Sequence, residues 1–135
     1  MKSCRMTITT ATDGQENSIV RDGEMKLSCS SALLRYQEEN AFVIMKIEGE
    51  VVEIERQGDY TLHLKLKKNE ILEGSIGIGG SEGPIQAVAR KVSYSVTKDS
   101  ILLSLQYDLI FGVEIQTIKL RLISRFFDGE GRTDQ

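Results

Sequence analysis

The stretch Ser100–Ile123, SILLSLQYDLIFGVEIQTIKLRLI, decides the fold that we expect for this chain. Apolar and polar side chains alternate on both sides of Gly112, which is typical of β-strands with one face in a core. Glycine permits a tight reversal, so the stretch predicts two antiparallel strands joined at Gly112. In the second strand the apolar residues stand at odd-numbered positions up to Ile115 and at even-numbered positions from Ile118. This change of parity predicts a β-bulge, one extra residue, near Gln116–Thr117. The side chains expected in the core are Leu103, Leu105, Leu109, Leu120 and Leu122.

The same alternation recurs along the whole chain. Its segments are separated by turn signals such as Asp13–Gly14 and Gly49–Glu50, and Asp22–Gly23 predicts a further turn or a bulge. The glycine-rich segment 77–84, GIGGSEGP, is expected to be a mobile loop between two strands. No convincing helical period is present. The chain is therefore predicted to be all-β, a single antiparallel up-and-down calycin-like β-barrel of about eight to ten strands.

One domain accounts for the 135 residues. We expect an ordered core from about residue 5 to 125 and a flexible tail over 126–135, in which Phe126 and Phe127 are able to dock. The formal net charge is −3, which argues against a nucleic-acid or anionic-membrane partner. The opening MKSCRMTITTATD lacks the apolar region of a signal peptide, and no later run is apolar enough to cross a membrane. We therefore expect a cytoplasmic protein.

The two cysteines, Cys4 and Cys29, have no metal-binding or C-x-x-C spacing. In a cytoplasmic protein they are expected to be free thiols. Cys29 follows an apolar strand and is expected to be a protected packing residue, whereas Cys4 lies near the terminus and is expected to be reactive. The alternative is a Cys4–Cys29 disulfide.

Three segments, taken in their order and spacing, resemble a known family. They are YQE at Tyr36–Glu38, IEGEVVEIERQG at Ile47–Gly58 and LQYDL at Leu105–Leu109. This order is similar to that of the YwiB-like family of small bacterial calycin-like (lipocalin-like) β-barrel proteins, and the similarity extends from about Ile8 to Ile123. The resemblance implies a barrel fold and a cytoplasmic location. It implies no established activity.

The sequence shows no catalytic constellation. His63 is the only histidine and shares a face with Lys65, so it is expected to point to solvent. One histidine does not build an ordinary zinc site. The glycine cluster lacks the Lys-Ser/Thr of a phosphate-binding loop, and no helix follows it. We expect neither an enzyme nor a bound cofactor or metal.

Three charged residues lie on the same predicted strand face as their apolar neighbours. Arg56 shares the face of Val52 and Ile54, Arg90 that of Val88 and Val92, and Glu38 that of Leu34 and Tyr36. If these faces are interior, two arginines and one carboxylate point into the barrel. One interpretation is a structural ion pair near a barrel mouth, because ion-pair networks occur without function. The other is an anion pocket in which the unmatched arginine binds a carboxylate or phosphate. Its hydroxyl donors are Tyr36, Tyr94 and Tyr107.

The sequence thus leaves two functional hypotheses. The first is a non-enzymatic cytoplasmic barrel that binds a small, partly apolar and anionic ligand in its interior. Its ligand enters beside the loop at 77–83, where Gly74 and Ala87 contribute little volume. The second is a protein-interaction or scaffold module whose barrel is filled. A cavity of about 300 Å³ or more distinguishes the two.

Overall fold

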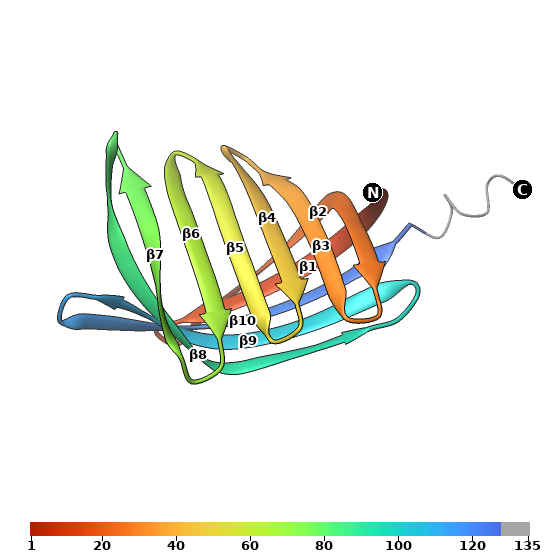
Figure 1. Ribbon diagram of the computed structural model, residues 1–135. Helices are drawn as coiled ribbons and strands as arrows, with labels where there is room; N and C mark the ends of the chain where they lie inside the picture. Colours follow the sequence, from red (N-terminus) through yellow and green to blue (C-terminus); the bar gives the residue numbers. More distant parts are fainter. Residues whose placement is uncertain (128–135) are drawn as a thin grey trace, which may run out of the picture.

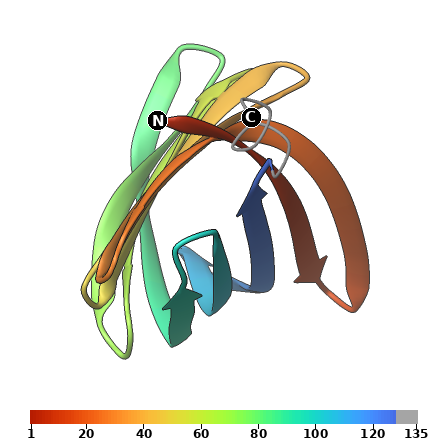
Figure 2. The same cartoon turned by 90° about the vertical axis from the view of Figure 1, so that its right-hand side faces the viewer.

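The computed structural model describes residues 1–127. The strands are β1 (Lys2–Thr12), β2 (Gln15–Ser28), β3 (Ser31–Glu38), β4 (Ala41–Glu48), β5 (Val51–Gly58), β6 (Tyr60–Lys67), β7 (Ile71–Ile78), β8 (Ser81–Val96), β9 (Ser100–Phe111) and β10 (Glu114–Phe126). Each strand pairs antiparallel with the next along the chain (Figure 1). Pairing of β1 with β10 closes the sheet, so all strands curve around one interior (Figure 2). The predicted all-β antiparallel barrel is confirmed.

Tight two-residue turns join most of the strands. Gly49 and Gly112 adopt positive φ angles of 61° and 59°, as the turns predicted there require. The prediction of a mobile loop over 77–84 is wrong, because β7 continues to Ile78 and β8 begins at Ser81. Only Gly79 and Gly80 lie between them, with φ of 60° and 85°. Two consecutive left-handed residues match the twist of a hairpin, and glycine adopts them without strain.

The pairing of β9 with β10 follows one regular register from Glu114 opposite Phe111 to Arg125 opposite Ser100. The bulge predicted near Gln116–Thr117 is therefore wrong. The apolar parity changes for another reason: Val113 lies in the turn, and Ile115 is on the outer face with 65% of its surface exposed. Neither is a core residue.

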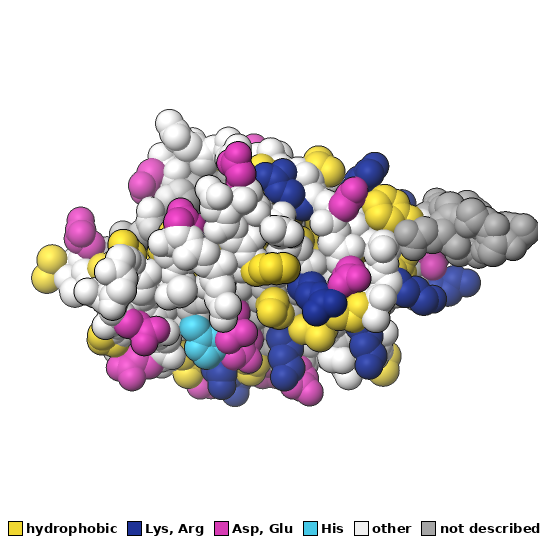
Figure 3. Space-filling model, turned by 90° about the horizontal axis from the view of Figure 1, so that it is seen from above, with side chains coloured by type: hydrophobic (Ala, Val, Ile, Leu, Met, Phe, Trp, Pro, Cys, Tyr) yellow, Lys and Arg dark blue, Asp and Glu magenta, His cyan; other side chains and the backbone are white. Residues whose placement is uncertain are grey.

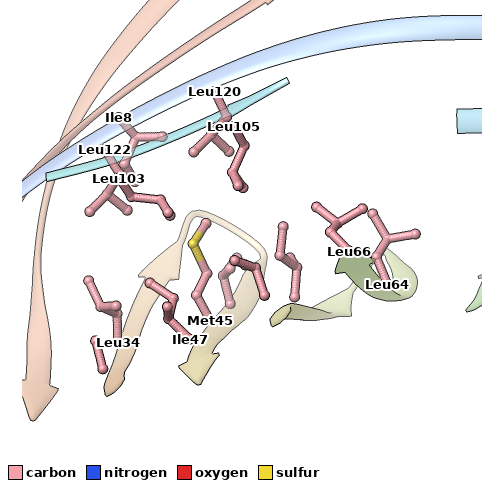
Figure 4. Close-up of a cluster of buried hydrophobic side chains, with 14 of the residues drawn as sticks. Ile8, Leu34, Met45, Ile47, Leu64, Leu66, Leu103, Leu105, Leu120 and Leu122 are labelled. Atoms are coloured by element: carbon pink, nitrogen blue, oxygen red, sulfur yellow. The ribbon is translucent and has the colours of Figure 1, made fainter. Parts of the chain in front are cut away.

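The core lies between two opposing parts of the barrel wall. Ile8, Leu103, Leu105, Leu120 and Leu122 extend from β1, β9 and β10 toward Leu34, Met45, Ile47, Leu64 and Leu66 of the strands across the interior (Figure 4). All five leucines predicted for the core are buried, with at most 7% of their surface exposed. Apolar side chains from nine further positions pack against this cluster.

The two thiols are free, but their environments are opposite to those predicted. Cys4 is fully buried, since β1 already begins at Lys2 and is paired on both sides, to β2 and β10. Burial raises the pKa of the Cys4 thiol. Cys29 lies exposed in the turn between β2 and β3.

The Asp22–Gly23 pair is neither a turn nor a bulge, because β2 runs through it and stays in register with β1 and β3. Glycine is needed there because a Cβ at Gly23 would collide with the backbone oxygen of Arg35 and the side chain of Tyr36.

The C-terminal phenylalanines both contact the barrel. Phe126 is the last residue of β10, and the N–H of Phe127 donates to the carbonyl of Ser3 at 3.3 Å. The guanidinium of Arg5 lies 5.1 Å from the centre of the Phe127 ring. Most of the tail expected over 126–135 lies outside the described residues.

Candidate functional site

A group of charged and phenolic side chains gathers at one end of the barrel, where β3 and β5 end. We call it the mouth cluster; its members are Tyr36, Glu38, Arg56, Asp59, Tyr60 and Tyr107. Arg56 continues the inward parity of Val52 and Ile54, so its side chain is directed into the barrel and is only 14% exposed. The prediction that Arg56 points inward is confirmed.

Each of the three guanidinium nitrogens of Arg56 has a partner within the protein. Nη1 donates to the carbonyl of Tyr60 at 2.8 Å, and Nη2 lies 2.9 Å from a carboxylate oxygen of Asp59. Nε lies 3.5 Å from a carboxylate oxygen of Glu38. The Tyr60 ring covers the guanidinium face, with 3.8 Å between the ring centre and Cζ. Arg56 is therefore matched rather than free to bind an anion.

The ion pairs in the mouth cluster set the ionisation of both partners. Burial lowers the pKa of Arg56, but the hydrogen bond to Asp59 and the negative charges of Asp59 and Glu38 outweigh it, so the pKa lies above its usual value. The bond from Arg56 in turn holds the pKa of the Asp59 carboxyl below its usual range. Arg56 and Asp59 are thus a cation and an anion near neutral pH.

Two tyrosines occupy the inner side of the mouth cluster. Tyr36 and Tyr107 are each 6% exposed. Burial raises the pKa of Tyr107 to about 12, with the neighbouring Tyr60 adding to the effect. Burial also raises the pKa of Tyr36 well above its usual value, and the charge of Glu38 contributes. Both phenols therefore stay neutral at physiological pH, and neither is poised to act as a base.

Arg90 does not point into the barrel, which corrects the sequence interpretation. The register of β8 against β9 shifts between Ala89 and Lys91, so Arg90 is the extra residue of a β-bulge. Its side chain is 59% exposed, and its Nε and Nη2 donate to one oxygen of Asp108 at 3.1 and 2.9 Å. Thr117 donates to the other oxygen at 2.8 Å. These bonds, from Thr117 first and then Arg90, lower the pKa of Asp108.

Tyr94 lies at the opposite end of the barrel from the mouth cluster. Its hydroxyl donates to the carbonyl of Gly49 at 2.6 Å and also lies 3.3 Å from the carbonyl of Ser30. It therefore links β8 to the β2–β3 and β4–β5 turns. Of the six predicted site residues, Tyr36, Glu38, Arg56 and Tyr107 come together, whereas Arg90 and Tyr94 lie elsewhere.

The model of a protein family described as "Domain of unknown function (DUF1934)" matches residues 3–122 of this chain. The chain belongs to this family. Its fold is similar to that in the crystal structure of ywiB protein from Bacillus subtilis, with a TM-score of 0.74 and 14% sequence identity. The alignment covers 93% of this chain and 90% of the other. No curated protein sequence matches this chain.

The DUF1934 assignment confirms the resemblance to YwiB-like proteins and their barrel fold. It supplies no activity, because the family is defined as one of unknown function. None of the described residues forms a helix that is long and apolar enough to cross a membrane.

A second polar group, on the outer face of β5 and β6, escaped the sequence interpretation. His63 Nε2 lies 2.6 Å from a carboxylate oxygen of Glu53 and 4.0 Å from one of Glu55. The bond to His63 lowers the pKa of Glu53. One donor atom from each of the three residues lies within 4.8 Å of the others, so the three are close enough to share a metal ion. The histidine is visible on the surface beside acidic side chains (Figure 3).

Strand register could have revealed two of these associations. Glu53 and Glu55 are two residues apart on one face, and His63 pairs directly opposite Glu55. The hairpin predicted between these strands already implies that neighbourhood. Asp59 and Tyr60 were missed in the mouth cluster because they follow the inward part of β5, where parity says nothing about side-chain direction.

Proposed function

We propose that this DUF1934 protein is a non-enzymatic cytoplasmic binding module that contacts a protein partner through its outer surface. The observation that carries this proposal is the interior, which is occupied by apolar side chains from opposing walls (Figure 4). Leucine, isoleucine and methionine side chains point inward from both walls, as in barrels that are filled by their own side chains.

The mouth cluster also favours a filled barrel. An anion entering the barrel would have to displace Glu38 and Asp59 from Arg56. Both carboxylates belong to the same protein and already lie beside the guanidinium, so a free anion competes poorly with them. The space attributed to Gly74 is not available to a ligand, because a Cβ there would collide with the backbone of His63. Gly74 allows β7 to approach β6 closely. Binding of a ligand inside the barrel stays a prediction, and these contacts do not favour it.

The contact surface that we propose is the turn between β9 and β10. The tip of this hairpin protrudes beyond the two neighbouring strands (Figure 1). Strand β8 pairs with β9 only as far as Ile110, and β1 pairs with β10 only as far as Ile118. Val113 at its tip is 99% exposed, and Phe111 and Ile115 are 39% and 65% exposed. Apolar side chains at a protruding turn are typical of a contact surface.

Site-specific photocrosslinking in cells tests the proposal. A photoreactive phenylalanine analogue placed at Val113 is expected to yield one discrete crosslinked protein. The same analogue at Glu50, in the β4–β5 turn at the opposite end of the barrel, is the matched control and is expected to yield none. Equal labelling from both positions, or no adduct from Val113, would contradict the proposed surface.

Native mass spectrometry of gently purified protein tests the filled barrel independently. The mass is expected to equal that of the polypeptide alone. A retained small molecule whose release lowers the unfolding temperature would show instead that the interior binds a ligand.

A further inference from the structure

A shallow groove on the outer face of the barrel combines cationic and neutral polar side chains. It has a volume of about 200 Å³ and is lined by residues of β1, β2, β8, β9 and β10. Lys91, Lys119 and Arg121 contribute its exposed cationic side chains, and the half-buried Ser104 and Gln106 lie between them on β9. Glu16 is the one carboxylate among the groove-lining residues.

The cations of this groove differ from the four arginines of the barrel that are held in ion pairs. Within residues 1–127, ion pairs of 4.0 Å or less engage Arg5, Arg35, Arg56 and Arg90. None of the ion pairs formed within that range involves Lys91, Lys119 or Arg121. Three cations therefore share one groove without neutralisation by a partner.

The β8 bulge is what brings Lys91 to this face. Ala89 and Val92 both face the interior, so Arg90 and Lys91 are consecutive residues that face outward. Asp108 neutralises Arg90 and leaves Lys91 available. A regular strand would have turned one of these two cations toward the core.

Strand register brings the three cations around one point. Lys91 pairs with Gln106, and Gln106 pairs with Lys119 on the far side of β9. The Cα atoms of the two lysines are thus about 10 Å apart, two strand spacings. Arg121 follows Lys119 by two residues on the same face, about 7 Å along β10, and pairs with Ser104. Their side chains can converge above Ser104 and Gln106.

We infer that this groove binds a phosphoryl group, as free phosphate or as part of a small phosphorylated molecule. A phosphoryl group carries close to two negative charges and three terminal oxygens, which matches three cations surrounding hydroxyl and amide donors. The Arg121 guanidinium can donate two parallel hydrogen bonds to it. The groove is smaller than the 300 Å³ or so typical of drug-sized ligands, so it suits the phosphoryl group rather than a large body.

Amide NMR titration of the whole protein with phosphate tests this inference, with ionic strength kept constant by chloride. Saturable shifts are expected at Ser104, Gln106 and Lys119. The double variant Lys119→Ala/Arg121→Ala is expected to weaken binding by about tenfold or more, because it removes charge-assisted hydrogen bonds. Lys65→Ala, an exposed cation on the outer face of β6, is the matched control and should bind phosphate unchanged.

Parallel titrations with pyrophosphate and with a nucleoside monophosphate identify the source of the group. Tighter binding of either one assigns a phosphorylated molecule, and equal affinities assign phosphate itself; both support the site. Shifts that do not saturate, or an affinity that the double variant leaves unchanged while its thermal unfolding is also unchanged, would overturn it. This test is independent of the β9–β10 turn and its partner.

Discussion

Arg56 and Arg90 have the same position in the apolar alternation of their strands, yet they lie on opposite faces of the barrel wall. β5 pairs regularly with β4 and β6, so Arg56 follows Val52 and Ile54 inward and meets Glu38 and Asp59. β8 contains one extra residue opposite β9, so Arg90 faces outward. The difference teaches that parity predicts a side chain's face only as far as the register stays regular.

Single-residue deletions in the two strands should give the largest contrast. Deleting Glu53 from β5 would turn either Val52 or Ile54 outward, and we expect no cooperative unfolding transition. Deleting Arg90 removes the extra residue and lets β8 pair regularly, so a cooperative transition should remain. Circular dichroism during thermal unfolding measures both. Loss of the transition in both variants would show that the bulge is essential to barrel closure.

The regular register beyond the bulge can be tested at Leu105, which pairs with Val92 on β8 and Leu120 on β10. It is 2% exposed, so Leu105→Ala should reduce the free energy of unfolding by about 2–5 kcal/mol through lost burial and a residual cavity. Leu102→Ala is the matched control: its side chain is on the outer face, 45% exposed, and should change stability by about 0.5 kcal/mol or less. Equal urea midpoints would contradict the assigned faces.

Alanine substitution of the two arginines compares their environments directly. Arg56→Ala leaves the partly buried Glu38 and the carbonyl of Tyr60 without a donor, and should cost about 1–3 kcal/mol. Arg90→Ala should cost less than about 1 kcal/mol, because this guanidinium is 59% exposed and Thr117 still donates to Asp108. Urea unfolding of both variants measures the difference. A greater loss for Arg90→Ala would reverse the contrast.

Acid titration should give the smallest effect. The pKa of Asp108 is lowered in the folded protein, so the unfolded chain binds its proton first and stability falls as pH drops below about 4. Thr117 provides the larger part of this effect, so Thr117→Val should flatten the fall in stability more than Arg90→Ala does. Unfolding free energies measured from pH 6 to 2 check the order, and the reverse order would make Arg90 the main partner.

The sequence by itself determined the fold class, the hairpin at Gly112 and the leucine core, because each depends on local alternation and turn chemistry. It also indicated that Arg56 shares a face with Val52 and Ile54, and that Glu38 lies on a face of the same kind. These predictions succeed where neighbouring strands pair without interruption. The family resemblance carried by three short segments pointed to the same barrel.

Tertiary structure alone decided where the remaining polar groups lie. The β8 bulge is a property of two strands together, so no periodicity within β8 could reveal that Arg90 and Lys91 both face outward. Cys4 is buried because its side chain lies on the interior face of the closed barrel, with Met6 and Ile8. Tyr94 reaches the β4–β5 turn across a sequence separation of 45 residues. Alternation specifies a face along one strand, whereas contacts across a closed barrel depend on how every strand is aligned with its neighbours.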